Sequence, residues 1–271
     1  MLATKKLFAG IALLGASVVA HAVPVAVDLS DWTSQGGSSQ WLVQSGNDSV
    51  LQRLNGAPTV FFDQNTTSTH GTALSGSIRV TPGGNGDDDF IGFVLGYDSG
   101  EIFSNSADYY LIDWKQGDQA GWGQGLAISH VTNGENGNTT GTSGSFWQHT
   151  SGEVDLITRA NNLGNTGWVD NTEYMFDLLF TASSIKVWVD DVLEIDVNPG
   201  QFGLNAFSDG SFGFYNYSQQ SVLYAGIKEE DFCVVNPNDS SCIGGNVPVP
   251  APLTLMGLGL LGIAMRQRRK A

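Results

Sequence analysis

The sequence predicts an all-β protein, an antiparallel β-sandwich of the jelly-roll type, on three observations. Residues 32–232 contain no long amphipathic helical pattern, and short β-branched and aromatic runs there alternate with Gly, Asn, Asp and Ser. About a dozen such runs fall within roughly 200 residues, the density expected of a sandwich. The chain is 41% hydrophobic and 10% aromatic, which is enough to build one core.

The expected strands follow one another along the chain, each bounded by turn-forming residues. Their ranges are 41–44, 49–54, 59–62, 74–81, 90–97, 109–115, 126–131, 173–181, 185–189, 193–197, 212–217 and 223–227. Ile185, Val187 and Val189 alternate with polar or bulky neighbours and lead into Asp190-Asp191 and a second apolar run, which indicates a hairpin. The polar, Gly-rich stretches 117–125 and 133–144 are expected to form surface loops.

Both ends of the chain are predicted to direct export. Lys5 and Lys6 precede an apolar run over 7–20 and the small-residue pattern at 20–22, so residues 1–22 are expected to be a secretory signal peptide cleaved after Ala22. At the other end an apolar run over 253–265 precedes a basic cluster over 266–270. This run is shorter than the ~20 residues of a comfortable bilayer span, and the basic cluster would stay cytoplasmic. We expect residues 23–246 to lie outside the inner membrane, with transient or permanent anchoring by the tail.

The C-terminal tail, residues 248–271, resembles the PEP-CTERM sorting signal of Gram-negative bacteria. The features that carry the resemblance are a Pro-x-Pro motif, a short Leu/Gly-rich segment and an arginine-rich end. It implies processing by an exosortase-type enzyme and delivery to the cell surface or the exopolysaccharide matrix. The sequence departs from the signal at the middle position of the motif, usually Glu, where Val249 or Ala251 stands.

The charge distribution excludes one class of partner. Six of the 12 basic residues lie in the two ends, so the segment between them carries six positive and 27 negative charges, a net charge of −21. Binding to nucleic acid depends on Lys and Arg that neutralise phosphates, so nucleic acid is excluded as a partner. Charged residues make up only 14% of the chain, against roughly 25% in a typical globular domain. This composition is typical of an exported, turn-rich β protein.

The usual nucleophile and zinc signatures are absent from the sequence. There is no G-x-S-x-G motif, and His70, His130 and His149 lack metal-ligand spacing. The only cysteines, Cys233 and Cys242, flank a turn-rich segment, which in an exported protein favours a disulfide. A metal site at these cysteines is the alternative, although neither a further cysteine pair nor a nearby histidine completes a ligand set.

The segment 194–198 is the strongest indication of catalysis. Sandwich glycosidases of the laminarinase type carry Glu-x-Asp-x-(x)-Glu on one strand, and here Glu194 and Asp196 are followed by Asn198. One of the two obligatory carboxylates is therefore missing. We predict an exposed strand edge and a protein that is not an enzyme. A glycoside hydrolase that uses Glu194 and Asp196 is the alternative.

Three adjacent carboxylates, Asp87, Asp88 and Asp89, follow the Gly-rich segment 83–86 and lead into an expected strand. Adjacent carboxylates repel one another unless a cation or a basic partner neutralises them, and Ca²⁺ takes six to eight oxygen ligands from such loops. A solvated acidic turn is the alternative in a chain with this much negative charge.

Three tryptophans lie in Gly-rich or polar surroundings, at Trp122, Trp147 and Trp168. Exposed indole rings on loops could stack on sugar rings, which makes these residues possible glycan contacts. In the alternative interpretation Trp147 and Trp168 cover the edge of the sandwich, because a Trp contributes much apolar area to packing.

Several stretches, in order and spacing, resemble the C-terminal domain of thrombospondins. They include Asp87-Asp-Asp-Phe-Ile-Gly-Phe-Val-Leu-Gly-Tyr97, Tyr110-Leu-Ile-Asp-Trp114-Lys115-Gln116, Trp147-Gln-His149-Thr, Gly167-Trp168-Val-Asp and Gly213-Phe-Tyr-Asn-Tyr-Ser218. The resemblance spans about residues 28–233 and implies a lectin-like, concanavalin A-type β-sandwich that binds calcium and takes part in cell adhesion and matrix contacts.

The resemblance favours Ca²⁺ at Asp87, Asp88 and Asp89. The family usually has a cysteine at the position of Gly56, paired with the counterpart of Cys233, so here the resemblance leaves Cys242 as the partner. We expect a domain over 23–233, a disulfide loop and linker over 234–247, and the sorting tail. The function expected is a calcium-binding adhesion or matrix module that contacts extracellular polysaccharide or matrix components.

Overall fold

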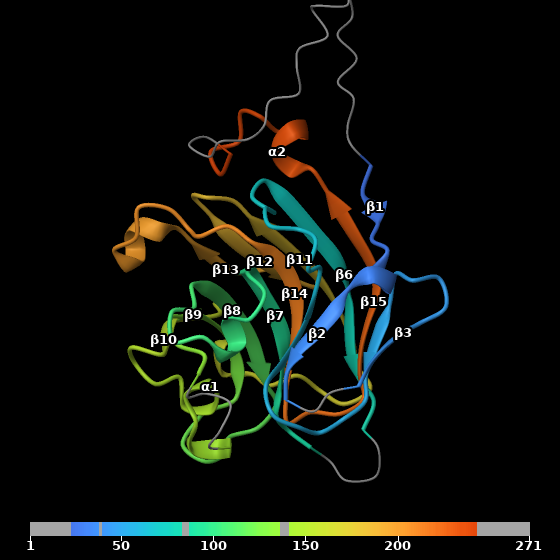
Figure 1. Cartoon of the computed structure of the whole chain (residues 1–271), viewed down its shortest axis with the longest axis vertical. Coiled ribbons are helices and arrows are strands. Elements are labelled where there is room, and N and C mark those ends of the chain that lie inside the picture. Colours follow the sequence, from blue (N-terminus) through green and yellow to red (C-terminus); the bar gives the residue numbers. More distant parts are fainter. Residues whose placement is uncertain (1–22, 38–39, 83–86, 136–140, 243–271) are drawn as a thin grey trace, which may run out of the picture.

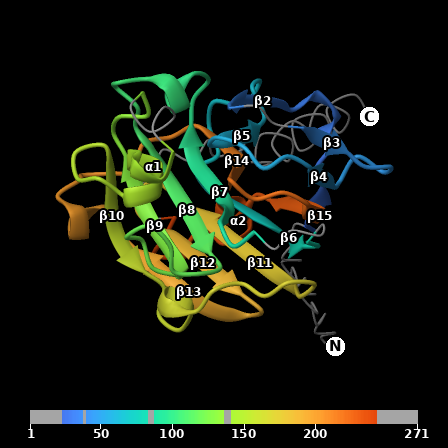
Figure 2. The same ribbon diagram turned by 90° about the horizontal axis from the view of Figure 1, so that it is seen from below.

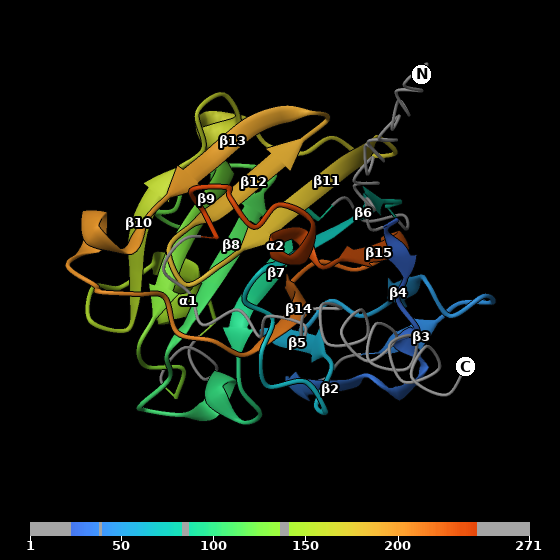
Figure 3. The ribbon, with the colours of Figure 1, turned by 90° about the horizontal axis from the view of Figure 1, so that it is seen from above.

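The computed structural model describes residues 23–37, 40–82, 87–135 and 141–242, and within them the chain forms two antiparallel sheets. One sheet has the strand order β13-β12-β11-β6-β15-β4-β3, with β1 paired to β15, and the other has the order β10-β9-β8-β7-β14-β5-β2. The two sheets stack as layers (Figures 1 and 3). The predicted all-β sandwich is therefore confirmed.

The strands of the first sheet are β1 (Val25–Ala26), β3 (Trp41–Val43), β4 (Val50–Gln52), β6 (Thr72–Val80), β11 (Glu173–Phe180), β12 (Ile185–Val189), β13 (Val192–Val197) and β15 (Val222–Glu230). Those of the second are β2 (Thr33–Gly36), β5 (Thr59–Phe62), β7 (Phe90–Tyr97), β8 (Tyr109–Lys115), β9 (Gly125–Val131), β10 (Val154–Arg159) and β14 (Ser211–Tyr217). The helices are α1 (Ser145–Gln148), α2 (Phe232–Val235) and the 3-10 turns η1 (Leu29–Asp31), η2 (Glu101–Phe103), η4 (Gly141–Ser143), η5 (Leu163–Asn165) and η6 (Pro199–Phe202).

The α-helices α1 and α2 have only four residues each, as the lack of helical periodicity predicts. Within the described residues, no helix is long and apolar enough to cross a membrane. The predicted signal peptide and sorting tail lie outside the described residues.

The hairpin expected near Asp190-Asp191 is present as β12 and β13. Both turn residues have positive φ, 49° and 62°, as a two-residue hairpin turn requires. The register between the strands shifts, because Val187 pairs with Ile195 and Trp188 pairs with Leu193. Glu194 is thus the extra residue of a β-bulge, and the simple alternation between Glu194 and Asp196 is broken.

Buried side chains form two layers, one on each face of the seven-stranded sheet. The larger core lies between the sheets and includes Phe93, Trp114 and Trp168. The second core lies on the outer face of the sheet, where Phe146 and Trp147 of α1 pack against that face. Figure 2 shows α1 over β8 and β9, on the side away from β12 and β13. We call the segment 141–149 the cap.

The two cysteines are joined, so the predicted Cys233–Cys242 disulfide is confirmed and the alternative of a metal site at the cysteines is excluded. The bridge closes the segment that follows β15 and α2. Ser183 Oγ donates a 2.8 Å hydrogen bond to the carbonyl of Ser241, which ties this loop to the turn before β12. The end of the domain is therefore held against the first sheet.

Candidate metal site and neighbouring surfaces

The carboxylates of Asp87, Asp88 and Asp89 lie together at the entry to β7. One oxygen from each lies within 4.8 Å of the others. Asp87 and Asp88 are half-buried, whereas Asp89 is 2% exposed. The three acidic residues thus converge, but they do not share one environment.

Asp87 carries the clearest sign of crowded negative charge. Burial, the charge of Asp89 with a hydrogen bond to it, and the charge of Asp88 raise the pKa of Asp87 to about 6. Asn55 donates a side-chain hydrogen bond to Asp87 and accepts one from Ser218 Oγ. A cation beside Asp87 would relieve this repulsion.

Asp88 is held by its backbone. Its carbonyl accepts hydrogen bonds from the N–H groups of Gln116 and Gly117, both at 3.2 Å. A Cβ at position 117 would overlap with the Asp88 carboxylate, so glycine is what lets this carboxylate lie against the backbone. The loop after β8 therefore fixes where the Asp88 carboxylate sits.

Asp89 is neutralised inside the protein by Lys115. The Lys115 ammonium lies 2.7 Å from Asp89 Oδ1, and both side chains are almost completely buried. The same ammonium lies over the rings of Phe90 and Trp147, at 4.9 and 4.5 Å from their centroids. Lys115 was not among the site residues expected from the sequence. The signal available was a lysine directly after the run 109–114, which is aromatic and aliphatic apart from Asp113 and predicts that Lys115 is buried with β8.

The donor set fits a hard cation. Carboxylate, amide and backbone oxygens are the ligands that Ca²⁺ prefers, with no strict geometry demanded. Asp87 and Asp88 have no cationic side chain paired with them among the described salt bridges, whereas one oxygen of Asp89 is already occupied. The residues that would hold Ca²⁺ are therefore Asp87 and Asp88, with Asp89 limited to its second oxygen.

A second polar cluster lies under the cap. Ser129 Oγ lies 2.8 Å from His149 Nδ1, and His149 Nε2 lies 3.0 Å from Asp113 Oδ2, although this second contact lacks hydrogen-bond alignment. All three side chains are buried. The trio contains the residue types of a hydrolase triad, but its burial leaves a substrate no access.

The structure corrects the expectation of exposed tryptophans at two of the three positions. Trp147 and Trp168 are 2% and 1% exposed, so their rings cannot stack on a sugar. They pack as the alternative interpretation expects, although Trp168 lies in the core between the sheets and Trp147 on the outer face of the seven-stranded sheet rather than at the edge. Trp122 is half-buried, and it stacks on His149 with ring centroids 3.8 Å apart. The guanidinium of Arg159 lies 4.6 Å from the Trp122 ring centroid. Much of the Trp122 ring is therefore already covered.

The two residues of the glycosidase alternative have partners of their own. The buried Glu194 carboxylate accepts hydrogen bonds from the backbone N–H groups of Asn162 and Leu163, at 2.8 and 3.0 Å, and from the Asn162 side chain at 3.2 Å. Asp196 is exposed and lies 3.9 Å from Lys186 Nζ. Glu194 therefore anchors the turn after β10.

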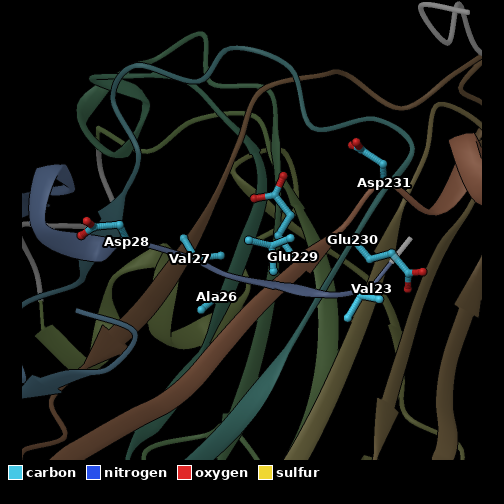
Figure 4. Close-up of a pocket in the computed structure, with 8 residues that line it drawn as sticks. Val23, Ala26, Val27, Asp28, Glu229, Glu230 and Asp231 are labelled. Carbon is cyan, nitrogen blue, oxygen red and sulfur yellow. The ribbon is translucent and has the colours of Figure 1, made fainter. Parts of the chain in front are cut away.

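A groove of about 530 Å³ runs between the outer edges of the two sheets, at strands β10 and β13. Its polar side chains include Thr158, Asn161, Asp196 and Gln201, and Phe202 contributes an apolar surface. A second, acidic pocket of about 380 Å³ lies between β1 and the end of β15, and Figure 4 shows the carboxylates of Glu229, Glu230 and Asp231 around it.

Comparison with known proteins identifies relatives of the domain. The chain is 27% identical over 200 residues to thrombospondin-2 of Gallus gallus, and 26% identical over 203 residues to thrombospondin-2 of Homo sapiens. Each match covers 70% of this chain, and the chain spans only 16% of the length of either relative. Among solved structures, the carbohydrate binding module CBM66 from Bacillus subtilis matches with a TM-score of 0.50 at 14% identity, covering 76% of this chain and 99% of that one. This likeness supports the fold.

Two sequence profiles match the chain. The PEP-CTERM protein-sorting motif matches residues 246–270, which implies exosortase processing and makes the chain an exported, cell-surface protein. The thrombospondin C-terminal region matches residues 37–232, well over half of the chain. On this match, the chain belongs to the thrombospondin C-terminal region family.

Proposed function

We propose that the protein is a cell-surface module that binds Ca²⁺ through Asp87 and Asp88 and serves in adhesion or matrix contacts without catalysing a reaction. Membership of the thrombospondin C-terminal region family and the PEP-CTERM motif support this setting. The observation that carries the metal site is the convergence of three carboxylates within 4.8 Å, of which, among the described residues, Asp89 alone has a cationic side chain as its partner.

Calcium would have a structural role here, because its positive charge would neutralise the carboxylates. Its bond to Asp87 and Asp88 would offset the repulsion that raises the pKa of Asp87, and would fix the start of β7, where the Asp88 carbonyl already accepts hydrogen bonds from the loop after β8. Because both segments lie at one end of the sandwich, the ion would rigidify the surface around them. Asn55 and its partner Ser218 extend the same surface.

The experiment compares thermal unfolding in calcium and in chelator for the wild type and for Asp87→Asn/Asp88→Asn. A ligand that binds only the folded state must raise its stability by mass action, by about 2.7 kcal/mol at a concentration 100 times Kd. Asp89 is left intact, because its removal would strand the Lys115 ammonium. The control variant is Glu173→Gln/Asp231→Asn, which removes two exposed carboxylates elsewhere. Equal Tm values with and without calcium in the wild type would refute the metal site.

A glycan is the partner that the groove between β10 and β13 favours. Its amide and carboxylate side chains can bond hydroxyl groups, and Phe202 offers an apolar face for a sugar ring. Asp196→Arg would fill the groove from an exposed position, with Glu173→Arg as the control outside it. We expect the first substitution alone to weaken binding of oligosaccharides from the exopolysaccharide of the producing cell, measured by calorimetry.

The non-catalytic part of the proposal is tested on a panel of β-glucans. No turnover is expected, because Glu194 is occupied by three N–H donors and no second carboxylate stands at position 198. Turnover that disappears in Glu194→Gln while the protein stays folded would establish the glycoside hydrolase alternative.

A further inference from the structure

Lys115 is a buried lysine whose ammonium group has a full set of hydrogen-bond acceptors. Its side chain is fully buried, and its ammonium donates to Asp89 Oδ1 at 2.7 Å, to the carbonyl of Asp88 at 3.2 Å and to Gln119 Oε1 at 3.3 Å. These three acceptors use all three donors of an ammonium group. The rings of Phe90 and Trp147 also lie close to Nζ. The positive charge is therefore fixed beside the acidic cluster.

Asp89 depends on this charge. Its carboxylate is buried on β7, and an unpaired carboxylate in such a place is strongly unfavourable. The backbone of Asp89 is tethered as well, because its N–H donates to Gln219 Oε1 and its carbonyl accepts from Trp168 Nε1. Asp89 cannot easily swing out to water, so a positive partner must come to it.

We propose that Lys115 is an internal counter-ion that occupies the place of a cation beside Asp89, so that the acidic segment 87–89 folds without metal. This inference rests on the proposed calcium function, and it divides the three carboxylates into two classes. The ammonium of Lys115 neutralises Asp89, and Asp87 and Asp88 remain available to bind an external cation. Metal binding then adds stability to a segment, 87–89, that is already folded.

The same lysine links the metal site to the cap. Gln119, which accepts from Lys115 through its side chain, also accepts a 3.3 Å hydrogen bond from Trp147 Nε1 through its backbone carbonyl. Trp147 belongs to α1 and covers the outer face of the seven-stranded sheet. Loss of the ammonium would therefore disturb the cap as well as the loop.

The test replaces the ammonium with an apolar group of similar length. The wild type, Lys115→Met and Lys115→Met/Asp89→Asn are compared by thermal unfolding in chelator and in saturating calcium chloride. Lys186→Met is the matched control, since it removes a partly exposed lysine that lies 3.9 Å from Asp196. Calcium stoichiometry is measured on the same samples by calorimetry.

We expect Lys115→Met to have a clearly lower Tm than the wild type in chelator, and the double variant to recover much of that loss. Calcium is expected to raise the Tm of Lys115→Met by more than it raises that of the wild type, because Asp89 becomes a full metal ligand. The double variant should lack this additional rise. If Lys115→Met is unfolded in chelator, recovery of its circular dichroism on addition of calcium also supports the inference.

Two results would overturn the inference. One is a calcium-induced rise in Lys115→Met no larger than in the wild type, and the other is a double variant no more stable in chelator than the single variant. If Lys115→Met responds to calcium and the wild type does not, the proposed calcium function fails while the role of Lys115 stands. If the wild type responds and Lys115→Met shows no additional rise, the proposed function stands and the role of Lys115 fails.

Discussion

Replacing Glu194 tests whether its carboxylate has a structural or a catalytic role. Its carboxylate is buried and accepts two backbone hydrogen bonds, from Asn162 and Leu163, and one from the Asn162 side chain. A hydrogen bond to a charged group contributes about 1.5–3 kcal/mol. Glu194→Ala strands the two backbone donors, so at the lower value for each we expect a loss of about 3 kcal/mol in the free energy of unfolding. Glu194→Gln keeps one acceptor oxygen and should lose about half as much.

The assay is thermal unfolding followed by near-ultraviolet circular dichroism. For a domain of this size 1 kcal/mol corresponds to roughly 2–4 °C, so Glu194→Ala should lower the Tm by about 6–12 °C. Asp196→Asn is the control on the same strand. Because Asp196 is exposed and only 3.9 Å from Lys186, its removal should change stability by less than about 0.5 kcal/mol.

The reasoning would be refuted by a Glu194→Ala protein that melts at the wild-type temperature. Such a result would mean that the turn after β10 does not depend on the carboxylate. It would also reopen the catalytic interpretation, in which the Glu194 carboxylate serves chemistry in the groove rather than hydrogen bonding to Asn162 and Leu163.

Three further predictions follow from charge and covalent structure. In chelator, the pKa of Asp87 is raised from 3.8 in the unfolded chain to about 6 in the folded protein. The contribution of Asp87 to stability is therefore fully present below about pH 4 and is lost as pH rises through 6. The difference in Tm between the wild type and Asp87→Asn should follow the same pH dependence, and calcium should reduce that dependence. Replacing His149 with Ala strands the buried Ser129 hydroxyl and should cost about 1–3 kcal/mol by chemical denaturation, whereas an unchanged midpoint would show that this hydrogen bond is dispensable. Reducing Cys233–Cys242 should cost about 2–3 kcal/mol for so short a loop; equal Tm values with and without reductant would contradict this.

Much of the sandwich could be predicted because strand formation depends on local patterns. The expected strands 90–97 and 109–115 coincide with β7 and β8, and the hairpin was marked by Asp190-Asp191. The strands β1, β2 and β10 were missed. β2 has the polar sequence Thr-Ser-Gln-Gly, and only its pairing with β5 makes it a strand. Short edge strands of this kind depend on a partner, so their own sequence carries little signal.

For the candidate site, too, some features could be predicted from local sequence and others could not. The convergence of Asp87, Asp88 and Asp89 needed no tertiary information, since they are neighbours in the chain. The ion pair of Asp89 with Lys115 joins residues 26 positions apart, and no local pattern indicates it. The bulge that removes Glu194 from the expected alternation is likewise a property of how β13 pairs with β12.

The sequence by itself determined the all-β class, the disulfide between the only two cysteines, the acidic cluster and the export signals, because each of these rests on composition or on residues close together in the chain. Only the tertiary structure decided which carboxylates remain open to a cation and which tryptophans are exposed. Burial and charge neutralisation depend on groups brought together from distant strands. Lys115 therefore neutralises Asp89, and Trp147 and Trp168 are buried, for reasons that lie in the packing of the two sheets and the cap.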